Sequence, residues 1–212
     1  MTDHYFSTDP SSPLEVVPME AVVWGHELRL DTASGVFARG RLDVGTAVLL
    51  DRTKPPTTGT SFLDLGCGYG VIAISLALAR PDIDVWAVDV NERALELTAR
   101  NAERMGVGER VRTAHPDQVP DGLLFDGIWS NPPIRIGKPE LHALLLRWFT
   151  RLAVQGEAVL VVGRHLGADS LQRWLGSQGF PTDRLASAKS FRVLRSSREG
   201  PEREAHRGQQ TR

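Results

Sequence analysis

The sequence lacks three features that define other classes of protein. Among its 212 residues there is one cysteine, Cys67, so neither an internal disulfide nor a cysteine-rich metal cage is available. The longest apolar run, Val71 to Ala79, is about half as long as a helix needs to cross a bilayer. The first 20 residues also lack a basic start followed by an apolar segment. We therefore expect a cytoplasmic protein with no membrane span and no metal site, stabilised by its core.

The charge is small overall and uneven along the chain. A formal net charge of −1 argues against a protein that coats nucleic acid nonspecifically. Residues 1–134 hold 11 Lys and Arg against 19 Asp and Glu, whereas residues 135–212 hold 14 against 7. This basic C-terminal third is typical either of a surface that attracts phosphate groups or of scattered arginines on solvated helices with a charged tail. Both interpretations stay open at this point.

Strand-like and helix-like segments alternate through most of the chain. Strands are expected at 61–65, 84–89, 110–114, 125–130 and 158–162, helices at 71–80, 91–105, 139–152 and 168–178, and a final hairpin over 184–194. Strands that alternate with helices form a parallel sheet covered by helices on both faces. Such sheets bind ligands beyond the carboxyl ends of their strands. The expected fold is a doubly wound α/β domain.

The N-terminal region has a different pattern. Apolar and polar residues partly alternate over 20–31 around Gly25-His26, which predicts a half-buried hairpin, and a short helix is expected to end before Pro55-Pro56. We therefore divide the chain into an N-terminal β cap with a lead-in helix (1–56), a core (57–195) and a tail (196–212). The tail lacks periodicity and is rich in Arg, Glu, Gly and Gln, so we expect it to be disordered.

The first strand of the core runs into a glycine loop, Asp64-Leu65-Gly66-Cys67-Gly68-Tyr69-Gly70, that opens a helix. A dinucleotide-binding loop would have glycine or alanine after Gly70, where this chain has Val71, and would need no acidic residue two positions before Gly66. S-adenosylmethionine fits better, because Asp64 can complement its positively charged amino acid end while the loop amides meet its carboxylate. We expect Gly66, Cys67 and Gly68 to contact this cofactor.

Two later strands end beside acidic residues. Asp89 follows the second strand of the core, where a carboxylate can accept hydrogen bonds from both ribose hydroxyl groups. Asp117, or the neighbouring His115, follows the third strand, where either side chain can border the adenine or can simply be exposed. We predict Asp89 as the ribose contact and Asp117 as a further cofactor contact.

The fourth strand leaves the sheet at Asn131-Pro132-Pro133-Ile134, beside the expected position of the methyl group. An exocyclic amine is a poor nucleophile because its lone pair is delocalised, so catalysis gains from acceptors for its hydrogens, such as the Asn131 side-chain oxygen and the Pro132 carbonyl. The prolines restrict the backbone and remove competing donors. An ordinary strand exit is the alternative interpretation. Arg135 and Lys138 follow, and either bind a substrate phosphate or are solvated.

At these residues the chain resembles the class I S-adenosylmethionine-dependent methyltransferases. In particular, it resembles the small-domain group that includes the ribosomal RNA small-subunit guanine-N2 methyltransferases. The resemblance spans roughly residues 37–194. It implies a mostly parallel seven-stranded Rossmann-like sheet, cofactor binding by the glycine loop and Asp89, and presentation of the target amine by Asn131-Pro132-Pro133. It also implies a substrate class, guanine in ribosomal RNA.

Two departures from that group affect the acceptor site. Many amino-methylating relatives have Tyr or Phe where this chain has Ile134, and stacking on an aromatic ring contributes about 1–3 kcal/mol per base. Either Ile134 packs less specifically against the base, or a residue such as Phe37 or Trp129 supplies the missing ring. The group's two-domain members also carry a second, degenerate copy of the fold, so substrate docking here must use the N-terminal cap, an oligomer or the basic end.

Other functions are compatible with the same residues. A protein glutamine amide has the same delocalised lone pair as a base amine, so a protein or a small molecule is an alternative methyl acceptor. The domain can also be a non-catalytic module that binds the cofactor or RNA, which the set of Asp64, Asp89 and Asn131 disfavours. A nucleotide-dependent oxidoreductase is a third alternative. The sequence favours methylation of an exocyclic amine, with guanine in ribosomal RNA as the preferred acceptor.

Overall fold

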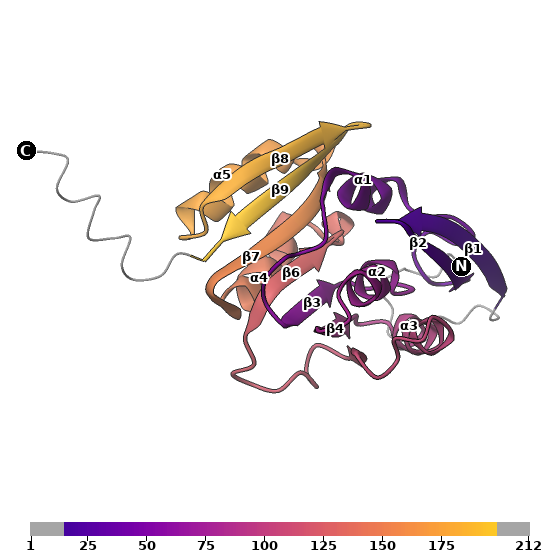
Figure 1. Ribbon diagram of the computed structural model, residues 1–212. Coiled ribbons are helices and arrows are strands. Elements are labelled where there is room, and N and C mark those ends of the chain that lie inside the picture. The colour runs from indigo at the N-terminus through magenta and orange to yellow at the C-terminus, as the bar shows by residue number, and fades with distance from the viewer. Residues whose placement is uncertain (1–14, 199–212) are drawn as a thin grey trace, which may run out of the picture.

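The computed structural model describes residues 15–198 (Figure 1). An antiparallel hairpin of β1 (Val16–Val23) and β2 (His26–Ala33) comes first, as the sequence predicted. The other elements are α1 (Val44–Arg52), β3 (Ser61–Leu65), α2 (Val71–Ala79), β4 (Asp84–Val88), α3 (Glu92–Arg104), β5 (Val111–Ala114), β6 (Phe125–Ser130), η1 (Ile134–Ile136), α4 (Lys138–Phe149), β7 (Leu152–Gly163), η2 (Arg164–Leu166), α5 (Ala168–Ser177), β8 (Thr182–Ala188) and β9 (Phe191–Ser197).

Seven strands form one sheet in the order β5-β4-β3-β6-β7-β9-β8. Neighbouring strands are parallel from β5 to β7, and β9 runs antiparallel to both β7 and β8. The chain winds outward in one direction from β3 and in the other from β6. The carboxyl ends of β3 and β6 therefore flank the switch point where such sheets bind ligands. This confirms the expected doubly wound, mostly parallel seven-stranded sheet with an N-terminal two-stranded cap.

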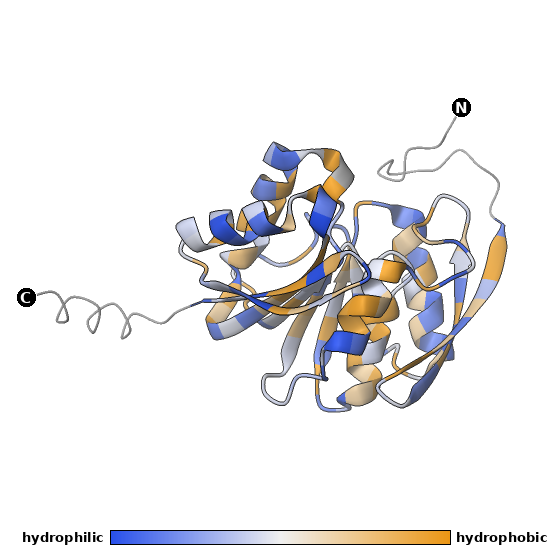
Figure 2. Ribbon diagram, turned by 90° about the horizontal axis from the view of Figure 1, so that it is seen from above, coloured by the Kyte–Doolittle hydropathy of each residue, from blue (hydrophilic) through white to orange (hydrophobic). Residues whose placement is uncertain are grey.

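Side chains that alternate along the strands build two cores, one on each face of the sheet. Phe62 and Val159 belong to the core beneath α1, α2 and α3, whereas Leu63 and Leu160 belong to the core beneath α4 and α5. Viewed from above, hydrophobic residues are concentrated along the strands and in the helices near the centre, and hydrophilic residues are common on the helices at the periphery (Figure 2). The layers are therefore helix, sheet and helix.

The β1–β2 hairpin packs on α2 and α3. Its buried side chains, which include Leu28 and Leu30, extend the core beneath these helices. The Asn101 side chain of α3 bonds both to the hairpin and to the glycine loop. Its Oδ1 accepts from the Asp31 amide at 2.8 Å, and its Nδ2 donates to the carbonyls of Asp31 and Tyr69, each at 2.9 Å. The hairpin is thus tied to the segment that follows β3.

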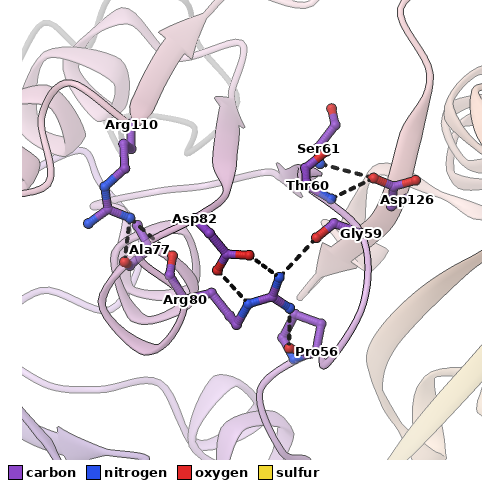
Figure 3. Close-up of polar contacts among 9 residues, drawn as sticks. All are labelled: Pro56, Gly59, Thr60, Ser61, Ala77, Arg80, Asp82, Arg110 and Asp126. Atoms are coloured by element: carbon purple, nitrogen blue, oxygen red, sulfur yellow. Dashed lines mark hydrogen bonds and ion pairs between the residues drawn. The ribbon is translucent and has the colours of Figure 1, made fainter.

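At the opposite end of the sheet, polar contacts hold the amino ends of the strands together (Figure 3). Arg80, at the end of α2, donates to the carbonyls of Pro56 and Gly59 and pairs with Asp82 at 2.6 Å. Asp126 of β6 accepts from the amides of Thr60 and Ser61 at the start of β3. These contacts fix the lead into β3, so the glycine loop starts from a rigid strand.

The last three strands are longer than the sequence indicated, β8 by two residues at its start and β7 and β9 by more. β7 begins at residue 152, because a stretch that reads as a turn, with Gln155 at φ 65° before Gly156, lies within the strand. β9 extends to Ser197, so residues 196 and 197 belong to the sheet and not to the expected tail. Ser196 is buried and its hydroxyl lies 2.8 Å from that of Thr182. Residues 199–212 of that tail lie outside the described residues.

The three-part division of the chain stays a prediction, although α1, assigned to the N-terminal part, packs on β7 and β9 of the sheet. Within residues 15–198, no helix combines the length and the apolar character that crossing a membrane requires. Over the same span, we find no group of three or more His, Cys, Asp or Glu side chains that could hold a metal ion.

Candidate active site

A cavity of about 460 Å³ opens at the carboxyl ends of β3, β4 and β6. This volume lies within the range of small-molecule sites, roughly 300–1,000 Å³. Its lining comes from distant parts of the chain, among them Phe37 before α1, Asp89 after β4, Asn131 after β6 and Phe191 in β9. A smaller hollow adjoins it between the glycine loop and the start of α1, and Gly66 is one of the residues that line both.

The glycine loop forms one wall of the smaller hollow. The amides of Gly66 and Cys67 donate to the Val88 carbonyl at 2.8 and 3.1 Å, which fastens the loop to β4. Gly70 has φ 87°, and a Cβ there would lie 2.7 Å from the Thr98 side chain, so this position requires glycine. A Cβ at Gly68 would meet nothing within 4 Å, so the backbone there is open to a ligand.

Asp89 lies in the wall of the larger cavity, as predicted. Its two carboxylate oxygens accept hydrogen bonds from the amides of Gly68 and Asn91, both at 3.0 Å. Burial raises the pKa of this carboxyl, since only 8% of the residue is exposed, and the two amides oppose that rise. The carboxylate keeps free lone pairs directed away from these amides and can accept further hydrogen bonds.

Asp64 lies beneath the loop and not in the cavity wall. Its Oδ2 accepts from the Ala73 amide in the first turn of α2 at 2.9 Å, and its buried Oδ1 has no hydrogen-bond partner in the described structure. Burial raises the pKa of Asp64 to about 7, opposed by the Ala73 amide and reinforced by the charge of Asp89. The structure thus gives Asp64 a place under the helix start, and direct contact with the cofactor amine stays a prediction.

Asp117 lies outside the lining of the cavity, and its neighbour Pro116 takes the place we expected for it. The exposed Asp117 carboxylate pairs with Arg147 of α4 at 2.8 Å, and this hydrogen bond lowers its pKa. His115 Nδ1 lies 3.7 Å from the same carboxylate. The ion pair with α4 turns Asp117 toward that helix, which the sequence around residue 117 does not indicate.

Asn131 lines both the cavity and the smaller hollow. Its Nδ2 donates to Asp43 Oδ2 at 2.8 Å and to Thr46 Oγ1 at 3.0 Å, and both partners belong to the start of α1. The Asn131 Oδ1 makes no hydrogen bond with any residue in the described part of the chain. The amide oxygen is therefore available as an acceptor, which is the role predicted for it. Sequence reasoning missed Asp43 and Thr46, because they precede Asn131 by more than 80 residues.

The two prolines line the cavity next to Asn131. The Pro132 carbonyl accepts from the Ile134 amide at 2.8 Å, and the Pro133 carbonyl accepts from the Ile136 amide at 3.2 Å. Both residues are held in a tight turn, and the Pro132 carbonyl keeps one lone pair for a second donor. The exit from β6 is therefore closed by two backbone hydrogen bonds, and its role in holding the acceptors rigid stays a prediction.

An aromatic ring reaches the cavity from two positions, one of them unexpected. Ile134 lines the cavity, and so does Phe37, which is 41% exposed. Trp129 does not: it is buried beneath α1, with its ring edge-on to Trp24 at 5.6 Å, so our expectation that it could replace the missing ring is wrong. Phe191 lines the cavity instead. Its pattern in the sequence indicated only a strand of the final hairpin.

Several cations lie around the cavity. Arg41 lines it, and none of the described residues forms an ion pair with this side chain. Lys138 is exposed at the start of α4, outside the lining, while the side chain of Arg135 lies outside the described structure. Two further cations lie close in sequence to residues that line the cavity, one after Gly163 of β7 and one before Phe191 of β9. The amide of Arg164 in η2 donates to the carbonyl of Ser190 at 2.7 Å, which brings Arg164 next to the turn that carries Lys189.

In sequence, residues 27–195 match the family described as methyltransferase small domain. The chain is 36% identical over 178 residues to the uncharacterized protein YbxB of Bacillus subtilis, which covers 80% of this chain and 86% of that protein. It is 42% identical over 180 residues to ribosomal RNA small subunit methyltransferase C of Hahella chejuensis, covering 81% of this chain. It spans only 50% of that relative, and 41% of the same enzyme from Shewanella loihica.

In structure, the chain is similar to the 16S rRNA N2 G1207 methyltransferase (RsmC) of T. thermophilus, solved with AdoMet and guanosine. The TM-score is 0.75 at 23% sequence identity, and the match covers 90% of this chain and 52% of that one. At this identity the similarity establishes the fold. Together with the family match, it confirms the resemblance to small-domain methyltransferases.

Proposed function

Because the chain belongs to the methyltransferase small-domain family, whose methyl donor is S-adenosylmethionine, we propose that it methylates an exocyclic amine of a guanine base in ribosomal RNA. The observation that carries this proposal is the Asn131 amide oxygen, which is free to accept and stands in the wall of a cavity shared with the glycine loop. Together with the Pro132 carbonyl it offers two acceptors, which match the two hydrogens of an amine, whereas a hydroxyl group has one hydrogen to donate. The expected cytoplasmic location remains a prediction.

The residues around the glycine loop suit S-adenosylmethionine, which supplies an electrophilic methyl group when bound. The start of α2, whose N-cap Gly70 has no side-chain cap, leaves amide groups for the cofactor carboxylate, and the absence of a side chain at Gly68 leaves room for the cofactor to approach the backbone. The lone pairs left on Asp89 can accept from the ribose hydroxyls. The glycine loop and Asp89 would hold the cofactor in the cavity that Asn131 also lines.

At the acceptor site, the role of the protein is to bind the amine and to orient its nitrogen. The Asn131 Oδ1 and the Pro132 carbonyl accept hydrogen bonds from the two amine hydrogens, which turns the nitrogen lone pair out of conjugation and toward the methyl group. The bound cofactor would supply the methyl group to an amine held in this way, and the amine would give up one of its two hydrogens as a proton. Alignment and exclusion of water by the closed turn at Pro132-Pro133 lower the barrier.

The lining of the cavity favours a base over a glutamine amide. Phe37 and Phe191 offer aromatic faces on which a flat heteroaromatic ring stacks, and a side-chain amide gains much less from them. Arg41, Arg164 and Lys189 lie in or near the rim, where RNA phosphates would pass when a base is splayed into the cavity. These features support an RNA substrate.

Label transfer tests the proposal. Purified protein is incubated with methyl-labelled S-adenosylmethionine and small ribosomal subunits from cells that lack the gene. We expect nuclease-sensitive label that mass spectrometry identifies as N2-methylguanosine. Asn131→Ala should bind the cofactor in calorimetry and lose turnover, whereas Gln178→Ala, which truncates an exposed amide at the end of α5, should behave as wild type. Nuclease-resistant label would move the acceptor to protein, and no label in RNA would overturn the proposal.

A further inference from the structure

We infer that the first turn of α1 positions the catalytic amide: Asp43 and Thr46 fix Asn131 so that its oxygen, and not its nitrogen, faces the methyl acceptor. This inference rests on the proposed function. It assigns to Asp43 and Thr46 a part in methyl transfer that involves no contact with the reacting atoms.

An asparagine side chain needs such a device because its two ends have almost the same size and opposite hydrogen-bonding character. If the amide turned by 180°, its NH2 group would face the amine of the substrate, and two donors would meet. Shape alone cannot prevent this rotation, so the hydrogen-bond partners must decide it. At Asn131 both partners of Nδ2 are oxygen atoms, Asp43 Oδ2 at 2.8 Å and Thr46 Oγ1 at 3.0 Å.

The flipped amide is disfavoured twice. It would lose the hydrogen bond to Asp43 and the present bond to Thr46, of which only the Thr46 hydroxyl could donate in return, and it would place the Asn131 oxygen against the carboxylate oxygen of Asp43. The carboxylate itself cannot move away easily. Asp43 is the N-cap of α1, and the same Oδ2 accepts from the Thr46 amide at 3.0 Å. A carboxylate at a helix N-terminus is stabilised both by the cap and by the helix dipole.

The space between these groups is kept open by Gly45. A Cβ at this position would lie 3.0 Å from Asp43 Oδ2, 3.0 Å from Phe191 Cε1 and 3.4 Å from Asn131 Nδ2. Glycine inside a helix costs about 1 kcal/mol relative to alanine. Here it lets the helix start, the amide and the aromatic ring approach one another. The acceptor site is therefore packed around the orientation of Asn131.

Paired substitutions separate positioning from folding. Asp43→Ser keeps a side-chain oxygen that caps α1 but is too short to reach Asn131, whereas Asp43→Asn keeps an oxygen that can serve both. Thr46→Val removes the hydroxyl at nearly constant volume, and Thr46→Ser retains it. Asp51→Ser and Thr53→Val make the same changes at the other end of α1, away from the cavity.

We expect Asp43→Ser and Thr46→Val each to lower kcat roughly tenfold, and together on the order of 100-fold, with KM for RNA and the Kd for cofactor unchanged. Asp43→Asn and Thr46→Ser should restore most of the rate. Variants at residues 51 and 53 should match wild type. A folded Asp43→Ser/Thr46→Val variant with kcat within twofold of wild type would overturn the inference.

A measurement without substrate keeps the inference separate from the proposed function. The side-chain NH2 signal of Asn131, assigned in nitrogen-15 NMR spectra by its loss in Asn131→Asp, should exchange slowly in wild type. It should exchange much faster in Thr46→Val, which leaves the cap intact. Equal exchange in the two proteins would refute the positioning role even if RNA were methylated. Slow exchange in a protein that methylates no RNA would refute only the proposed function.

Discussion

The two halves of the active site are built in different ways. The cofactor half is local: Gly66 and Cys67 bond to Val88, and Gly68 bonds to Asp89, so β3, β4 and the loops that follow them suffice. The acceptor half is assembled from segments that are far apart, since Asn131 is held by the start of α1 and faced by a ring from β9. A short motif can encode the first half, whereas only the complete fold creates the second. The two halves should therefore respond separately to substitution.

The largest effect should come from Asp64, which lies beneath the glycine loop, and it concerns the free energy of unfolding. The pKa of Asp64 is about 7 in the folded protein, compared with 3.8 for an aspartate in the unfolded chain. The neutral carboxyl stabilises the fold fully below pH 3.8, and this contribution is lost as the pH rises through about 7. Relative to wild type, Asp64→Asn should therefore gain about 3 kcal/mol in unfolding free energy between pH 5 and pH 8.

Urea unfolding without cofactor at the two pH values measures this gain. Asp121→Asn, which removes an exposed carboxyl, should follow the wild-type pH dependence. Parallel stability curves for Asp64→Asn and wild type would show that this carboxyl is not buried as the structure has it.

Next in size is the loss of the ribose contact. Asp89→Asn removes a charge that accepts from two backbone amides and turns one acceptor into a donor. We expect cofactor binding to weaken roughly 30-fold, or about 2 kcal/mol, in calorimetry, with RNA binding unchanged. Asp117→Asn provides the comparison, because the structure places Asp117 outside the cavity. An equal loss in that variant would show that the adenine reaches Asp117, as the sequence suggested.

A smaller effect is expected from the ring in the acceptor half. Phe191→Ala should raise KM for RNA about tenfold, the lower part of the range for a stacked base, and leave the Kd for cofactor unchanged. Phe191→Tyr keeps the ring and should bind RNA as wild type does. Adding Ile134→Phe to Phe191→Ala should recover part of the loss. If both binding constants changed together in Phe191→Ala, the two halves would not be separable.

The smallest effect concerns RNA binding by two cations near the rim of the cavity, Arg164 and Lys189. Arg164→Gln/Lys189→Gln should weaken RNA binding a few-fold at physiological salt and reduce the salt slope of log K by about 1. Binding titrations over several salt concentrations measure this slope. The control is Arg184→Gln/Arg195→Gln, because these cations already pair with acidic groups, Asp169 for Arg184 and Asp183 for Arg195. An identical slope in both double variants would place the RNA elsewhere.

The fold and the places of the glycine loop and Asp89 could be predicted because their signals are local. The strand 61–65 and the glycine loop follow from hydrophobic runs and from glycines at fixed spacing, and the position of Asp89 follows from the end of the next strand. The partners of Asn131 could not be predicted, since no pattern near residue 131 points to α1. Phe191 and Trp129 show the same limit, because the face to which a strand residue points depends on which helix covers it.

Asn101 gives the N-terminal hairpin a mechanical role. One amide joins both backbone groups of Asp31 to the carbonyl of Tyr69 in the glycine loop. The hairpin adds no strand to the main sheet, yet through Asn101 it supports the glycine loop from behind and opposes any outward movement of that loop. Loss of these Asn101 hydrogen bonds would therefore shorten the residence time of the cofactor, even though Asn101 lies outside the cavity.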